Sequence, residues 1–255
     1  MIRFTVLGAV ALTLAAGQSA SAQNQSLEDK ASDPTASLMS FQLQNFYSPN
    51  NHNSDEDRNV LQFRAAIPYQ LGGTSNIARL TLPYFTSTPA GTSGFGDMTL
   101  FNLTTFDQPW GRYGVGLVAL LPTGSSQLSA EKWALGPALG GVAQAPWGLW
   151  GLFNQNLFTV DGDGNKPDVN ISTLQPILNV KLQNGWSVGN SEMTFVYDWD
   201  ADEFTSLPLG VQVSKLVKTG GPPVQMILSY ERNFYDEGMG PKDTIGLTAK
   251  LLLPK

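Results

Sequence analysis

Apolar and polar residues alternate along most of the chain after Ser37. Between positions 59 and 69, every odd position from Leu61 to Ile67 is apolar, whereas Gln62 and Arg64 occupy even positions. A period of two is typical of a β-strand whose two faces meet different surroundings. The same pattern predicts twelve strands, at residues 38–47, 59–69, 76–87, 95–106, 113–121, 132–144, 148–160, 169–182, 186–199, 204–217, 224–234 and 243–253.

Strand length distinguishes a soluble β-sandwich from a membrane β-barrel, because apolar and polar residues alternate along the strands of both. Strands of soluble sandwiches centre near about 5 or 6 residues, whereas a tilted strand that crosses a bilayer needs about 9 to 11. The predicted segments have the longer size, and their number is even, as in bacterial outer-membrane barrels. The pattern therefore predicts an all-β fold over residues 37–255, a transmembrane antiparallel up-and-down β-barrel of about 12 strands.

The connections between these segments also alternate in character. One set is short and holds turn residues, such as Gly72-Gly73 and Asn184-Gly185, whereas the other set is longer and richer in acidic residues. This predicts a periplasmic side with short turns and an external side with long loops. Aromatic residues near the strand ends predict two interfacial girdles, with Tyr69, Trp110, Tyr113, Trp147 and Trp186 at the short turns and Tyr47, Tyr84, Trp133, Trp199 and Tyr230 at the long loops.

The polar face of the predicted barrel defines candidate lumen residues. These are Gln42, Gln44, Gln62, Arg64, Arg79, Thr81, Gln175, Lys181, Glu192, Asp198, Gln212, Glu231 and Lys250. A turn at Gly72-Gly73 puts Arg64 opposite Thr81 and Arg79 opposite Ala66, so the two guanidiniums are diagonal neighbours. They are able to bind an anion or to pair with the acids Glu192, Asp198 and Glu231 across the lumen, either as a selectivity site or as ion pairs that hold a narrow barrel together.

The segments between residues 95 and 144 fit this scheme least well, because both faces carry Gly or apolar side chains. Their register is therefore the least determined part of the prediction. We expect this third of the wall to face a plug or a neighbouring subunit, and Gly136, Gly140 and Gly141 form a candidate surface for such packing.

The N-terminal residues have the features of a secretory signal peptide. Arg3 precedes an apolar stretch, and the small residues Ala20, Ser21 and Ala22 follow it. We expect residues 1–22 to direct export through the Sec pathway and to be removed. Residues 23–36 show no clear period, which leaves a disordered lead and a small plug inside the lumen as alternatives.

Composition narrows the chemistry further. The formal net charge is -6, only 14% of residues are charged, Cys is absent and there is a single His. Disulfide bonds and Cys-ligated metals are excluded, and an acidic chain offers no basic surface for nucleic acid. We therefore expect no nucleic-acid partner, no metal site, no cofactor and no catalytic residues.

Two loops contain residues that suggest chemistry. Asp161 to Asp168 places oxygen ligands at alternate positions, as calcium loops do, but Lys166 stands where the EF-hand pattern requires Gly. His52 lies close to Ser54 and Asp55, which suggests a lipid hydrolase but lacks positioned oxyanion donors. We interpret both as solvated loops.

Several short motifs recur in a known family. They are 56–64 (EDRNVLQFR) followed by Ile67-Pro68, 94–102 (GFGDMTLFN), 132–137 (KWALGP), 174–176 (LQP), 207–210 (LPLG) and the end 253–255 (LPK). With them the chain resembles, over residues 37–255, the outer-membrane transporter-like barrels grouped with phenol-degradation meta-pathway proteins and labelled neuromedin U in bacteria. The resemblance implies an outer-membrane barrel with a transport role.

Taken together, the sequence favours an outer-membrane channel or transporter of a Gram-negative bacterium. Its expected partners are outer-membrane lipids and a small solute, aromatic or otherwise hydrophobic. The alternatives are a closed barrel with a structural or adhesive role and, less favoured, a lipid-acting barrel enzyme. The sequence does not determine the solute, the oligomeric state or whether the pore is open.

Overall fold

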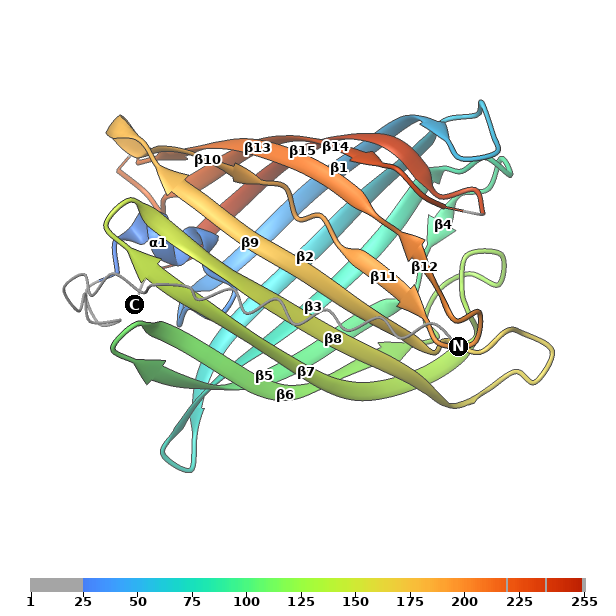
Figure 1. Cartoon of the computed structure of the whole chain (residues 1–255), viewed down its shortest axis with the longest axis horizontal. Helices are drawn as coiled ribbons and strands as arrows, with labels where there is room; N and C mark the ends of the chain where they lie inside the picture. Colours follow the sequence, from blue (N-terminus) through green and yellow to red (C-terminus); the bar gives the residue numbers. More distant parts are fainter. Residues whose placement is uncertain (1–24, 219, 237, 254–255) are drawn as a thin grey trace, which may run out of the picture.

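The computed structural model describes residues 25–218, 220–236 and 238–253, so the expected signal peptide lies outside the described residues. One antiparallel sheet closes into a barrel, because the first strand pairs with the last (Figure 1). The strands are β1 (Met39–Asn51), β2 (Arg58–Leu71), β3 (Thr74–Ser87), β4 (Gly94–Phe95), β5 (Met98–Gln108), β6 (Gly111–Leu121), β7 (Lys132–Ala145), β8 (Gly148–Gly162), β9 (Ile171–Lys181), β10 (Trp186–Asn190), β11 (Phe195–Asp198), β12 (Glu203–Ser206), β13 (Pro208–Val217), β14 (Val224–Asn233) and β15 (Pro241–Leu253).

Three crossings of the barrel wall are interrupted, each made of two consecutive strands. They are β4 with β5, β10 with β11, and β12 with β13. The barrel therefore has twelve strands, which confirms the predicted fold class. The predicted register is also confirmed, since Arg64 lies opposite Thr81 and Ala66 opposite Arg79.

Short turns connect the strands at one end of the barrel. Gly72 and Gly73 both have positive φ between β2 and β3, and Asn184 and Gly185 do so before β10. This left-handed backbone matches the right-handed twist of the flanking strands, which is why Gly and Asn occupy these turns.

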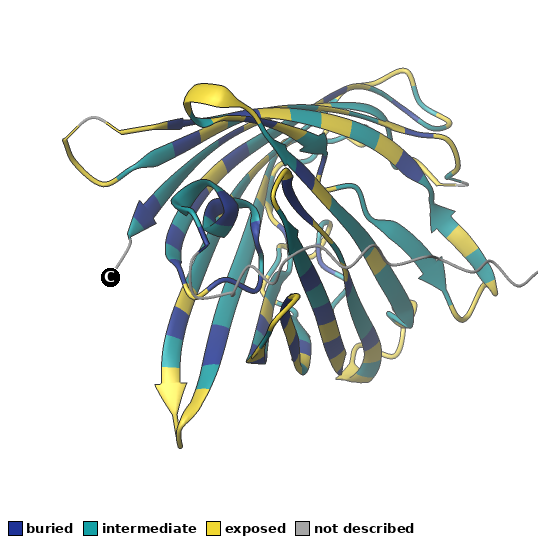
Figure 2. Cartoon of the chain, turned by 60° about the vertical axis from the view of Figure 1, so that its left-hand side comes forward, coloured by how far each residue is buried: buried dark blue, intermediate teal, exposed yellow. Residues whose placement is uncertain are grey.

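The outer surface of the wall is apolar over most of its strands. Leu43 is 59% exposed, whereas its neighbours Gln42 and Gln44 are buried in the interior. Figure 2 shows this alternation as bands of exposed and buried residues along the strands. A continuous apolar surface of this kind needs a nonaqueous neighbour, and a bilayer supplies one.

No helix among the described residues is long and apolar enough to span a bilayer.

The wall from β5 to β8 turns a second apolar face into the barrel. Its buried core consists of Phe101, Leu103, Val118, Ala134, Ala138, Phe153 and Leu157. These side chains pack on one another inside the lumen, and among the residues between 95 and 144 Arg112 also contacts Asp33 and Thr35 of the segment before β1. The expectation that this third of the wall faces a plug thus agrees with the contacts of Arg112, whereas most of its inner face packs on itself. Gly136 and Gly140 also point inward, and a Cβ on Gly140 would lie 2.5 Å from a ring carbon of Phe153. Gly140 therefore makes room for the largest side chain of this core.

A bulge divides the ninth crossing between β10 and β11. Trp186 and Val188 face outward at even positions of β10, whereas the even position Glu192 faces the lumen. The apolar positions thus change from even to odd within one crossing. An extra residue in the wall keeps both halves with their apolar side chains outward, as bulges do. The amide of Ser191 still donates to the carbonyl of Gly210 at 3.1 Å.

Candidate lumenal site

The segment that precedes β1 lies inside the barrel at its short-turn end (Figures 1 and 2). It contains the helix α1 (Leu27–Ser32), whose first turn is capped by Ser26, and we call residues 25–38 the plug. Its apolar side chains pack against Leu216 and Leu252 of the wall. Burial of these residues stabilises the segment in the barrel.

Polar contacts to five strands or strand ends hold the plug from different sides. Asp33 is fully buried, accepts hydrogen bonds from Gln25 (2.8 Å) and Thr35 (2.8 and 2.6 Å), and lies 3.6 Å from Arg112, which also donates to the carbonyl of Thr35 at 3.2 Å. Further contacts are Asp29 to Lys181 at 3.0 Å, Glu28 to Lys218 at 3.4 Å, Gln225 to the hydroxyl of Ser32 at 3.5 Å, and Nζ of Lys250 to the carbonyl of Ala31 at 2.5 Å. The acids of the plug thus face cations of the wall.

Two cavities lie along the lumen beyond the plug. The inner cavity, of about 100 Å³, lies between the plug and the middle of the barrel. The outer cavity, of about 370 Å³, extends from the middle toward the long loops. Both cavities are lined by Arg64 and Glu192, so this pair lies at the boundary between them.

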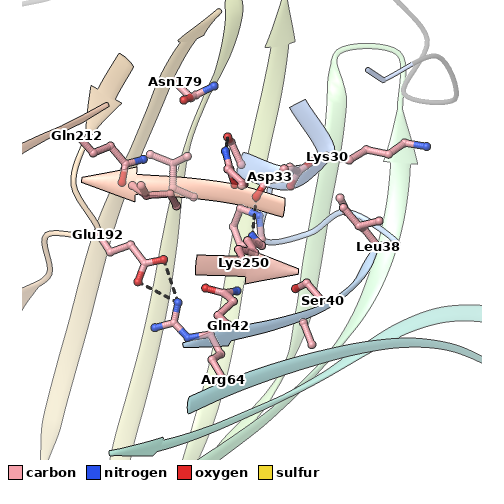
Figure 3. A pocket seen from close by; sticks show the side chains of 18 of the residues that line it. Lys30, Asp33, Leu38, Ser40, Gln42, Arg64, Asn179, Glu192, Gln212 and Lys250 are labelled. Atoms are coloured by element: carbon pink, nitrogen blue, oxygen red, sulfur yellow. Dashed lines mark hydrogen bonds and ion pairs between the residues drawn. The ribbon is translucent and has the colours of Figure 1, made fainter. Parts of the chain in front are cut away.

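Arg64 and Glu192 form an ion pair across the lumen (Figure 3). Nη1 of Arg64 donates to both carboxylate oxygens of Glu192 at 2.9 Å. Gln44 donates to the same carboxylate at 3.4 Å, and Gln62 donates to Gln44 at 2.7 Å. The pair joins β2 to the bulge after β10 and narrows the passage.

Arg79 behaves differently from its diagonal neighbour. Its guanidinium carbon lies 4.0 Å from the ring centre of Phe101 and 5.6 Å from that of Phe153. It makes no hydrogen bond or ion pair with any residue that the structure describes, and its Nε is shielded from solvent. Stacking on the rings stabilises the cation but satisfies none of its donors.

The other predicted lumen residues serve different contacts. Lys181 and Lys250 hold the plug, as described above. Glu231 accepts a hydrogen bond from Ser191 at 2.8 Å, and Asp198 accepts from the amides of Asp200 and Ala201 in the following turn. Of the three acids considered as partners for the arginines, only Glu192 contacts one among the described residues.

The aromatic residues proposed as girdles are placed at the ends of the wall. Nine of the ten are exposed: Tyr47, Tyr84, Trp110, Tyr113, Trp133, Trp147, Trp186, Trp199 and Tyr230. Tyr69 is half-buried, and its hydroxyl donates to Asn102 at 2.7 Å. Trp150 is also exposed and is the third residue of β8, so it too lies near a strand end.

The two loops with suggestive chemistry use their polar groups within the protein. The ring of His52 lies 3.1 Å from the carbonyl of Asn233, and Ser54 accepts from the amide of Glu56. In the second loop, Asp168 pairs with Lys132 at 2.7 Å. The hydrogen bond from the amide of Asn165 lowers the pKa of Asp163. No group of three metal-ligating side chains gathers in the described part of the chain.

Sequence reasoning did not identify several residues of the site. Phe101, which supports Arg79, belongs to the segments between residues 95 and 144 whose faces were ambiguous, and Phe153 belongs to the predicted strand 148–160. Arg112 and Lys218 lie near turns, where charge is ordinary. A usable indication was present in the plug itself, where Glu28, Asp29 and Asp33 outnumber Lys30.

Comparison with known proteins supports the fold. No family model matches the sequence, and no curated protein matches it. The crystal structure of the COG4313 outer membrane channel from Pseudomonas putida F1 is similar, with a TM-score of 0.63 and 16% identity over 87% of this chain and 98% of that chain. Outer membrane phospholipase A from Escherichia coli gives a TM-score of 0.46 and 12% identity over 85% of this chain and 90% of that chain. At these identities the likeness concerns the fold alone, and the fold is a closed twelve-stranded antiparallel barrel.

Proposed function

We propose that the protein is an outer-membrane channel for small solutes with a hydrocarbon or aromatic part. The observation that carries this proposal is the arrangement of the lumen, in which two cavities meet at the single ion pair Arg64–Glu192. Both cavities have polar and apolar walls, which suit a small amphipathic molecule. The likeness to an outer membrane channel and the family motifs in the sequence support the same function.

The plug closes the channel at the short-turn end of the barrel. It is attached through side chains and packing, and it forms no strand of the wall. A segment held in this way is able to leave its place while the barrel stays intact, because the ladder hydrogen bonds of the wall do not depend on it. The expected signal peptide and girdles fit an exported protein inserted in the outer membrane.

Swelling of liposomes tests the proposal. The mature chain, refolded into liposomes, is expected to admit small solutes slowly, and a variant that lacks residues 25–36 is expected to admit them faster. Heat-modifiable gel migration serves as the control for folding of both proteins. A folded barrel without residues 25–36 that admits no solute would instead support a structural or adhesive role.

A separate measurement addresses lipid chemistry. We propose that the protein has no catalytic residues, so His52→Ala is expected to leave lipid turnover at background. Turnover by the natural chain that disappears in His52→Ala would contradict this.

A further inference from the structure

The inner cavity contains an excess of positive charge that the protein itself does not neutralise. Arg64, Arg79, Lys250 and Glu192 act on one another electrostatically. Three cations and one carboxylate leave a net charge of +2 in this cluster. Lys30 and Asp33 also line the cavity, but their charges cancel.

Within the described part of the chain, Arg79 is the member of this cluster that has no hydrogen-bonding or ion-pair partner. Glu192 is occupied by Arg64, and Lys250 donates to the carbonyl of Ala31. Arg79 is partly buried, with its Nε shielded from solvent, and a ligand that supplies the missing acceptors would stabilise such a cation. We propose that the inner cavity binds a small monocarboxylate whose carboxylate contacts Arg79.

The shape of the site favours a carboxylate over a neutral polar group. Phe101 and Phe153 cover the guanidinium of Arg79, which leaves its edge to present N–H groups to the cavity. A planar guanidinium donates two parallel hydrogen bonds to a carboxylate. Arg64 and Lys250 also line this cavity and add positive charge to it.

The rest of the cavity suits the hydrocarbon part of the ligand. Its apolar lining consists of Ala36, Leu38, Ala66, Ile77, Pro176, Ile177, Leu178 and Ile227. An apolar cavity of about 150 Å³ accommodates benzene. The inner cavity of about 100 Å³ adjoins the outer cavity at Arg64 and Glu192, so it holds a small acid whose far end extends toward the outer cavity. Benzoate is a suitable probe, and benzamide is its neutral counterpart of nearly the same shape.

Isothermal titration calorimetry of the refolded mature chain in detergent at pH 7 tests the site. Benzoate is expected to bind and benzamide to bind much more weakly. Because hydrogen bonds to a charged group are lost, Arg79→Met is expected to weaken benzoate binding by roughly 10- to 100-fold. Arg58→Met is the matched control, since Arg58 lies over the ring of Phe85 at 5.0 Å but lines the outer cavity.

Defined outcomes overturn the proposal. They are equal affinity for benzamide and benzoate, tighter binding of inorganic phosphate than of benzoate, or an effect of Arg58→Met equal to that of Arg79→Met. If Arg79→Met does not give a heat-modifiable barrel, Arg79→Lys keeps the charge but removes the planar donor pair. It is expected to bind about tenfold more weakly, and unchanged affinity would overturn the site.

The role of this site in selecting a transported solute rests on the proposed function, whereas the binding does not. Binding of benzoate in detergent together with no swelling of liposomes would refute the proposed channel function and support the binding site. Swelling that does not depend on the charge of the solute, together with no binding of benzoate, would support the channel function and refute the binding site.

Discussion

Asp33 offers a direct test of how the plug is held. Its carboxylate has no exposed surface, accepts hydrogen bonds from Gln25 and Thr35, and faces Arg112. Asp33→Ala removes all of these contacts at once. We expect the plug to leave its place more often, while the wall stays folded because it has its own ladder.

The size of the effect follows from burial. Breaking a buried ion pair costs about 3 to 5 kcal/mol, and we take the lower value, because Arg112 lies 3.6 Å from Asp33 and keeps Asp107 at 2.7 Å. A cost of about 3 kcal/mol raises the fraction of displaced plug by about 100-fold. Glu28→Gln is the matched control, because Lys218 is 59% exposed and surface pairs contribute about 0 to 1 kcal/mol.

Hydrogen exchange of the backbone amides in residues 27–38, followed by mass spectrometry, measures this fraction. Asp33→Ala is expected to exchange about 100-fold faster in this segment, and Glu28→Gln by less than about fivefold. Rates in Asp33→Ala equal to those of the natural chain would refute the reasoning. So would equal acceleration in both variants.

Three further changes test the wall and the lumen. A Cβ on Gly116 would lie 1.8 Å from the carbonyl oxygen of Asn102, so Gly116→Ala is expected to lose the heat-modifiable band, whereas Gly141→Ala, with its nearest atom at 3.7 Å, should keep it. Glu192→Gln removes the carboxylate of the cluster formed by Arg64, Arg79, Lys250 and Glu192. The repulsion between that carboxylate and an anion about 5 Å away in water is about 0.8 kcal/mol. The chloride-to-potassium permeability ratio in planar bilayers should therefore rise about fourfold, and an unchanged ratio would contradict this arrangement of charges. Phe153→Ala empties a site that is 1% exposed, which should lower the free energy of unfolding in urea by about 3 kcal/mol; a change below about 1 kcal/mol would show that the inner core relaxes around the cavity.

The strands and the register of β2 with β3 were predictable for physical reasons. A lipid-facing wall forces one face of each strand to be apolar, so alternation identifies the strands and their orientation. The two-residue turn at Gly72-Gly73 then fixes which residues pair, and Arg64 indeed lies opposite Thr81. The bulge was harder to predict. The sequence did contain an indication of it, because the apolar residues change from even positions at Val188 to odd positions at Met193.

The interior could not be predicted in the same way. Where both faces of a strand are apolar, the pattern does not tell which face is inward, and so the contact between Gly140 and Phe153 was not foreseen. The plug contains one short helix, and its sequence shows no regular alternation of apolar and polar residues. Its position depends on ion pairs such as that of Asp29 with Lys181, two residues that are 152 positions apart in the sequence. The contacts of Arg79 could not be predicted for the same reason, because the rings on which it stacks belong to β5 and β8.

The plug adjoins the seam where the two ends of the sheet meet. It leads directly into β1, and β1 pairs with β15 through partners such as Gln42 and Lys250. Lys250 also holds the carbonyl of Ala31, and Leu252, two residues later, packs on the plug. The last strand to be made therefore carries both the edge that completes the sheet and the groups that fix the plug. Pairing of β15 with β1 therefore also completes the surface on which the plug is held.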